Sequence, residues 1–210
     1  MKVISTNIGT STKIVWNGKN TTTGIYKSPI NKPIYLDIED VLGDTVVDRK
    51  YHGGVHKACY LFSADNYPYW KEKYPHLEWD WGMFGENLTL EGLDESQIRI
   101  GSTYKLGTVL VQITQPREPC YKLGIRFGDQ GILKQFIDHG FPGTYVRVLK
   151  PGKVTVGDSM ELVEESKSPL TVQQFFNLLF SPTKDRDLVQ QAINNPALPL
   201  GKREKLKKWA

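Results

Sequence analysis

The sequence has few cysteines, no long apolar run and no visible secretory signal, and each shortage excludes a class of protein. Two of the 210 residues are cysteine, too few for a disulfide framework, so both are expected to be free thiols or ligands. The longest apolar run is residues 58–62, whereas a membrane span needs about 20 residues. The first ten residues contain no apolar signal core. We therefore expect a cytoplasmic protein with no membrane partner.

Familiar catalytic signatures are also missing. The sequence has no HExxH or CxxC motif for zinc, no GxSxG motif of a serine hydrolase, and neither GxGxxG nor a Walker motif for nucleotides.

The excess of positive charge belongs to the end of the chain. The formal net charge is +4, but residues 166–210 carry eight Lys and Arg against three Asp and Glu, and the remainder has a net charge of −1. A nucleic-acid-binding domain usually carries its basic surface on its main body. We therefore expect no nucleic acid as a partner.

Short β-like segments dominate residues 1–165. They are rich in Val, Ile, Thr and Tyr and are mostly bounded by turn-forming residues. The segments are 2–8, 13–16, 34–38, 57–62, 88–90, 103–106, 109–114, 144–149 and 153–156. Their close spacing predicts a mostly β fold, a barrel or sandwich of mainly antiparallel strands, with helices at 63–74 and 132–139.

Residues 166–210 predict a segment of three short helices. Thr171 and Gln174 have the spacing of a capping box. An apolar stripe at helical spacing follows, made of Val172, Phe175, Phe176, Leu179 and Phe180. Two more helices are expected at 185–194 and 200–209. Because so few residues do not easily fold alone, we expect this segment to pack on the main domain (1–165) or on a partner. A second copy of the chain, in a homodimer, is one such partner.

The first candidate site is a Gly-Gly turn among basic residues. Gly53 and Gly54 permit positive φ and let backbone N–H groups approach a ligand. Arg49, His52 and Lys57 flank the turn, and this combination suits a phosphate group. The alternative is an ordinary turn with solvated charges.

The second candidate site combines Gly85, Glu86 and Asn87 just before the segment 88–90. These residues offer donors and acceptors at a loop. An ordinary turn explains them at least as well, because Asn tolerates the left-handed region.

The third candidate site is the loop that follows the apolar segment 109–114. Gln115, Arg117 and Cys120 lie there between two prolines, which stiffen the loop. Nearby cations favour the thiolate of a cysteine, the form that attacks electrophiles or binds soft metals. Cys59, in contrast, lies in the apolar run and is expected to be structural.

Together these three segments resemble the signature segments of MOSC-domain proteins, in particular the bacterial YiiM branch. The matching motifs are His-Gly-Gly (52–54) with Lys57, Phe-Gly-Glu-Asn-Leu (84–88), and Gln-Pro-Arg (115–117) with Pro-Cys (119–120). The helical tail is also similar. One departure is Val55-His56, where related proteins often have Pro-Asp.

The resemblance implies a closed antiparallel β-barrel that binds the molybdenum cofactor (molybdenum-molybdopterin). Cys120 would be the catalytic residue and the protein ligand to the metal, and the pterin would supply the other sulfurs. The implied cofactor-binding residues are Arg49, His52, Gly53, Gly54, Lys57, Gly85, Glu86, Asn87, Gln115 and Arg117.

The function implied is reduction of small N-hydroxylated compounds such as 6-N-hydroxylaminopurine, with electrons from a separate reductase protein. A second hypothesis is a carrier or transfer module for the cofactor or for sulfur, with a persulfide on Cys120. A third is an interaction protein whose basic tail binds an acidic partner or nucleic acid.

Overall fold

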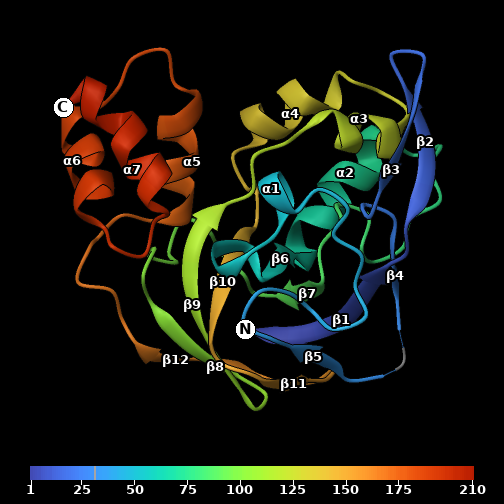
Figure 1. Cartoon of the computed structure of the whole chain (residues 1–210), viewed down its shortest axis with the longest axis horizontal. Helices are drawn as coiled ribbons and strands as arrows, with labels where there is room; N and C mark the ends of the chain where they lie inside the picture. The colour runs from blue at the N-terminus through green and yellow to red at the C-terminus, as the bar shows by residue number, and fades with distance from the viewer. Residues whose placement is uncertain (31) are drawn as a thin grey trace.

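A computed structural model describes residues 1–30 and 32–210 of the chain, and a mixed eight-stranded sheet forms its centre (Figure 1). The strand order is β12-β8-β9-β10-β6-β7-β1-β4. These strands are β1 (Lys2–Gly9), β4 (Lys27–Pro29), β6 (Cys59–Ser63), β7 (Leu88–Glu91), β8 (Thr103–Leu106), β9 (Val109–Pro116), β10 (Thr144–Lys150) and β12 (Met160–Glu164). Two small sheets pair β5 (Ile34–Leu36) with β11 (Gly152–Val154), and β2 (Thr12–Trp16) with β3 (Lys19–Thr23).

The prediction of a mostly β, closed antiparallel barrel is wrong. The edge strands β4 and β12 do not pair with each other, and β6 and β7 run parallel. An isolated bridge between Lys2 and Ser159 and a few backbone hydrogen bonds join the start of β1 to the chain around the start of β12. Strand β4 is short and ends at Pro29, which has no N–H to extend a ladder. About 31% of the described chain is strand and about 28% is helix, so the fold is mixed.

An aromatic cluster joins one group of helices to the sheet. The helices are α2 (Tyr67–Lys73), preceded by the 3-10 turn η2 (Ala64–Asn66), α3 (Tyr121–Phe127) and α4 (Ile132–His139). Phe62 of β6 stacks on Phe84 with ring centroids 4.2 Å apart, and Trp70 and Phe136 bring α2 and α4 onto them. The bounds predicted for the helix at 132–139 are confirmed, and it ends where Gly140 adopts a φ of +77°.

The C-terminal helices α5 (Val172–Phe180), α6 (Arg186–Asn194) and α7 (Leu200–Leu206), followed by the 3-10 turn η3 (Lys207–Trp209), form a second group in Figure 1. The predicted capping box of Thr171 and Gln174 is confirmed in both directions. Buried apolar side chains of this segment share one core with the sheet. Phe180 of the predicted stripe is 36% exposed, however, and Leu178 is buried instead. The domain boundary at residue 165 stays a prediction.

A hairpin that the sequence analysis missed stands beside α3 (Figure 1). Strands β2 and β3 pair through a tight turn in which Asn17 and Gly18 both have positive φ. Asn-Gly is the strongest short hairpin signal, so this signal was present but unused. Trp16 at the end of β2 stacks on Tyr121 of α3, with ring centroids 4.7 Å apart.

Among the described helices, none has the length and apolar composition of a membrane span.

Candidate active site

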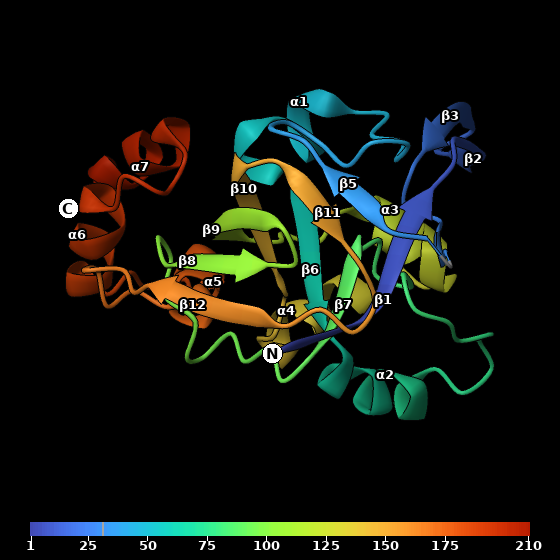
Figure 2. The same cartoon turned by 90° about the horizontal axis from the view of Figure 1, so that it is seen from below.

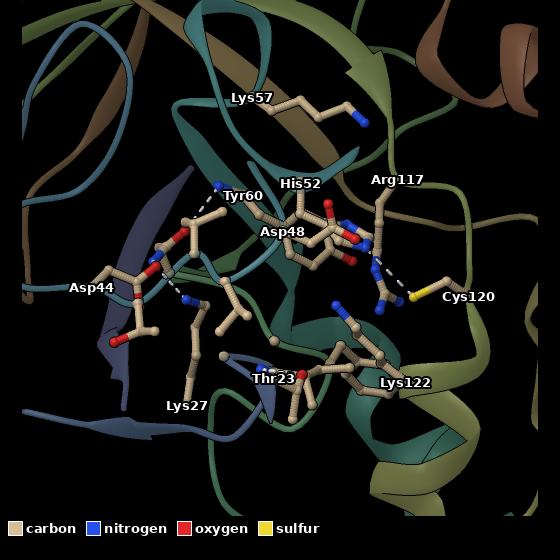
Figure 3. A pocket seen from close by; sticks show the side chains of 18 of the residues that line it. Thr23, Lys27, Asp44, Asp48, His52, Lys57, Tyr60, Arg117, Cys120 and Lys122 are labelled. Atoms are coloured by element: carbon tan, nitrogen blue, oxygen red, sulfur yellow. Dashed lines mark hydrogen bonds and ion pairs between the residues drawn. The ribbon is translucent and has the colours of Figure 1, made fainter. Parts of the chain in front are cut away.

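A pocket opens where several loops meet at one end of the sheet (Figure 3). Its walls come from the segment 23–27, the segment 44–48, the short helix α1 (Arg49–His52), the 3-10 turn η1 (Val55–Lys57) and the loop after β9. The lining is completed by Ala58, Tyr60, Phe84, Gly85, Asn87, Tyr145 and, from α3, Lys122. The pocket therefore draws on residues that are more than 100 positions apart in the chain.

Two of these walls approach each other at a glycine. A Cβ placed on Gly24 would lie 1.8 Å from the backbone oxygen of Thr45, a distance that no side chain can adopt. Glycine at position 24 therefore lets the segments 23–27 and 44–48 lie against each other and enclose one side of the pocket.

Cys120 faces His52 at the opposite side of the pocket. The Cys120 Sγ atom lies 3.8 Å from Nε2 of His52, and the Cys120 residue is half-buried. Burial, together with the charges of Lys122, Arg117 and Lys57, lowers the pKa of His52 to about 4. His52 is therefore a neutral imidazole at physiological pH, next to the thiol.

Two buried cations lie close to Cys120 in the same wall. Arg117 is 6% exposed and Lys122 is 7% exposed, and both line the pocket. The Arg117 guanidinium lies 5.5 Å from the ring of Tyr60 and 5.3 Å from that of Phe136, and its Nη1 atom has no hydrogen-bond partner within the described chain. Neither cation forms an ion pair with any described carboxylate. This part of the pocket, Arg117, Cys120 and Lys122 together with His52, is called the cationic end below.

The other end of the pocket holds a cation that is fully paired. Lys27 Nζ forms an ion pair with Asp44 Oδ2, and the two side chains are 7% and 3% exposed. Asp44 Oδ2 also accepts from Asn87 Nδ2 at 2.9 Å, and Asp44 Oδ1 accepts from the backbone N–H of Gly9 at 2.8 Å. We call Lys27, Asp44 and Asn87 the paired end, because its buried charges are matched within the chain.

The structure brings six of the eleven predicted site residues together. His52, Lys57, Gly85, Asn87, Arg117 and Cys120 all line the pocket. Gly54 has the positive φ expected of the turn, at +87°, whereas Gly53 is extended. Neither glycine belongs to the pocket wall. The parts assigned to these residues in holding a cofactor stay predictions.

Three other predicted residues have structural partners away from the pocket. Arg49 pairs with Glu39 and Asp40 on the surface. Glu86 is fully buried and accepts from the hydroxyl of Tyr67 and from backbone N–H groups of its own loop, so it organises that loop. Gln115 is 1% exposed, and its Nε2 atom donates to a backbone oxygen at 3.3 Å.

Comparisons with known proteins place the chain in a family. The model of the MOSC domain matches residues 48–161, more than half of the chain. The chain belongs to the MOSC domain family. YflK of Bacillus subtilis (strain 168) is 33% identical over 196 residues, which are 93% of this chain and 88% of YflK. The crystal structure of YiiM from Geobacillus stearothermophilus superposes with a TM-score of 0.82 at 29% identity, over 99% of this chain and 97% of that one. This MOSC protein is therefore YiiM-like.

A protein of Gibberella moniliformis named a reductase is 37% identical over 150 residues. Those residues are 70% of this chain but 27% of the fungal protein, so the MOSC part makes up a minority of it.

The MOSC match leaves out part of the pocket. Lys27 and Asp44, which form the paired end, lie before residue 48. The sequence analysis missed both, and it missed Tyr60 and Tyr145 as pocket residues. Tyr60 and Tyr145 lie within apolar strand patterns, which gave no reason to assign them to a site. Lys27 and Asp44 are 17 positions apart and meet only through the fold.

Proposed function

We propose that this MOSC protein is a molybdenum cofactor-dependent reductase of small N-hydroxylated compounds such as 6-N-hydroxylaminopurine. The observation that carries the proposal is the cationic end of the pocket. Arg117 and Lys122 are buried beside a half-buried thiol and have no carboxylate partner in the described chain. A buried charge is costly unless it is paired. These residues therefore suit an anionic ligand that also binds a soft metal.

The residues of the pocket suit both the metal of the cofactor and its pterin with the anionic groups. Cys120 would hold the metal as its protein ligand, because a thiolate is a soft donor. Among the described residues, no three His, Cys, Asp or Glu side chains gather to hold a metal ion by themselves, which suits a metal that arrives with its own sulfur ligands. Arg117 and Lys122 would hold the anionic groups, and Asn87 would contact the pterin.

The reaction is a two-electron reduction of the N–O bond. The N-hydroxylated substrate takes up two electrons and two protons, the N–O bond breaks, and an amine and water leave. When bound, the cofactor supplies the redox chemistry. The chain's own residues bind and orient: the cations neutralise the ligand, and neutral His52 fills the space beside Cys120 without adding a further charge.

The test is cofactor analysis and activity of protein made in a host that synthesises the cofactor. We expect bound molybdenum and pterin, and reduction of 6-N-hydroxylaminopurine with sodium dithionite as electron source. Cys120→Ser should lose at least 100-fold in kcat/KM, because a hydroxyl is a harder and weaker ligand. The matched control is Cys59→Ala in the buried strand β6, which should keep most of the activity.

Two outcomes would overturn the proposal. Equal activity of Cys120→Ser and the wild type would exclude Cys120 as the ligand. Labile sulfur on Cys120 with neither metal nor pterin would instead favour the carrier function, in which Cys120 bears a persulfide.

A further inference from the structure

The C-terminal helix α7 contacts the loop that carries Cys120, although the two are far apart in sequence. Lys202 of α7 forms an ion pair with Glu118, two residues before Cys120. The segment that leads into α7 is held by Arg147 Nη2, which donates to the backbone oxygen of Ala197 at 2.5 Å. Helices α7 and α1 both lie on the upper side of the view in Figure 2. A molecule bound to α7 would therefore lie beside the Cys120 loop.

The exposed surface of α7 and η3 is basic and contains apolar anchors. Lys205, Lys207 and Lys208 are exposed, and the pairing of Lys207 with Glu204 leaves a net positive charge. Trp209 is 44% exposed and Leu200 is 62% exposed. Exposed aromatic and apolar side chains beside charged ones are typical of protein interfaces. We call these five residues the α7 surface.

The proposed reaction requires a partner that this surface fits. Each turnover consumes two electrons, and a donor must be oxidised by two electrons to supply them. Residues 166–210 have a net charge of +5 against −1 for residues 1–165, and α7 contacts the Cys120 loop through Lys202. Such a surface attracts an acidic protein and raises its rate of encounter.

We propose that the α7 surface is the docking site of an acidic electron-donor protein, which delivers its electrons beside Cys120. This inference rests on the proposed reductase function and adds the place and the charge of the partner. A protein suits the surface better than a nucleic acid does, because the lysines of the α7 surface lie on one short helix and its adjoining turn, with Lys184 over the ring of Trp209 as the neighbouring cation. Nucleic acid binding usually requires a longer basic stripe.

The experiment compares two electron sources on the same holoenzyme. Reduced flavodoxin, an acidic flavoprotein, serves as the protein donor, and sodium dithionite serves as the small reductant. The test variant is Lys205→Glu/Lys207→Glu/Lys208→Glu. The matched control reverses three exposed lysines elsewhere, Lys71→Glu/Lys105→Glu/Lys150→Glu, on α2, β8 and β10.

At low salt, the test variant should lose about tenfold or more in kcat/KM for flavodoxin, as expected when electrostatic steering is removed. Its dithionite-driven turnover, its cofactor content and its circular dichroism should match those of the wild type. Wild-type activity with flavodoxin should fall as salt rises, because salt screens exposed charges, and that of the variant should change little. The control variant should keep most of its activity with flavodoxin.

The results separate the docking surface from the catalytic function. If the wild type fails with dithionite, the reductase function itself is wrong. If dithionite works but flavodoxin does not, or if both triple variants respond alike, the docking proposal is wrong. Salt-sensitive binding of a short DNA duplex that the test variant loses, with unchanged flavodoxin kinetics, would show that the α7 surface binds nucleic acid instead.

Discussion

The two ends of the pocket hold buried cations in opposite electrostatic situations. At the paired end, Lys27 meets Asp44, and Asp44 is further satisfied by Asn87 and a backbone N–H group. At the cationic end, Arg117 is equally buried, but its neighbours are aromatic rings. A pair that is complete within the chain leaves no buried charge unmatched in the folded protein. A buried cation without an anionic partner destabilises the ligand-free protein, and it favours the binding of an anionic ligand.

The largest effect is expected from breaking the paired end. Lys27→Met leaves Asp44 buried without its cation, and removal of one partner of a buried ion pair typically costs about 3–5 kcal/mol. The free energy of unfolding should fall by about that amount in urea denaturation. The double variant Lys27→Met/Asp44→Asn should regain a large part of the loss, because no charge is then left unpaired. A loss below about 1 kcal/mol in the single variant would contradict this account.

A buried carboxyl group gives a third case for the comparison. Glu95 is fully buried, its Oε1 atom accepts from the Gly143 N–H at 2.7 Å, and no described cation pairs with it. Burial, assisted by Asp94 and Asp65, raises the pKa of Glu95 from 4.5 to about 7. A carboxyl group can therefore escape the cost of burial by becoming neutral, whereas a guanidinium group in a protein stays charged.

Glu95 makes the stability of the protein fall as pH rises between about 4.5 and 7. In that range the folded protein holds a proton that the unfolded chain has released, so the unfolded state binds fewer protons. The full effect is about 3 kcal/mol for a pKa change of this size. Glu95→Gln should remove this dependence while keeping the acceptor for Gly143. Urea unfolding at pH 5 and pH 8 measures it, and parallel pH profiles of variant and wild type would contradict the assignment.

The cationic end should respond through binding rather than through folding. Arg117→Met removes an unpaired buried charge, so the unfolding free energy of the cofactor-free protein should stay the same or rise. Bound pterin in protein from a cofactor-producing host should fall about tenfold or more, which corresponds to about 1.4 kcal/mol of binding or more. Arg117→Lys should restore part of the pterin content. Unchanged pterin in Arg117→Met would place the anionic groups of the cofactor elsewhere.

The comparison also shows which features the sequence could predict. The loop with Arg117 and Cys120 was predicted because prolines, cations and a thiol lie within six positions of one another. Local patterns likewise predicted the capping box of Thr171 and Gln174 and the bounds of α4. The paired end was missed because Lys27 and Asp44 meet only in the folded chain. The closed barrel that the resemblance implied is wrong, and the strand pattern alone left barrel and sandwich open, because short strands do not fix whether the two edge strands of the sheet will pair.

The smallest effect is expected at the contact between the β2–β3 hairpin and α3, next to the cationic end. Trp16 of the β2–β3 hairpin stacks on Tyr121, the residue that follows Cys120. A two-stranded hairpin is at best marginally stable alone, so this contact should help to hold it against α3. Trp16→Ala should lower the unfolding free energy by about 1 kcal/mol beyond the loss of buried area, and amide exchange in β2 and β3 should become faster.

Val15→Ala, at a neighbouring side chain that is 64% exposed, is the matched control and should change neither the unfolding free energy nor the exchange. Because Lys27 of the paired end lies in β4, which pairs with β1, exchange at β4 should be the same in both variants, and faster exchange there would show that the two ends of the pocket are not built independently.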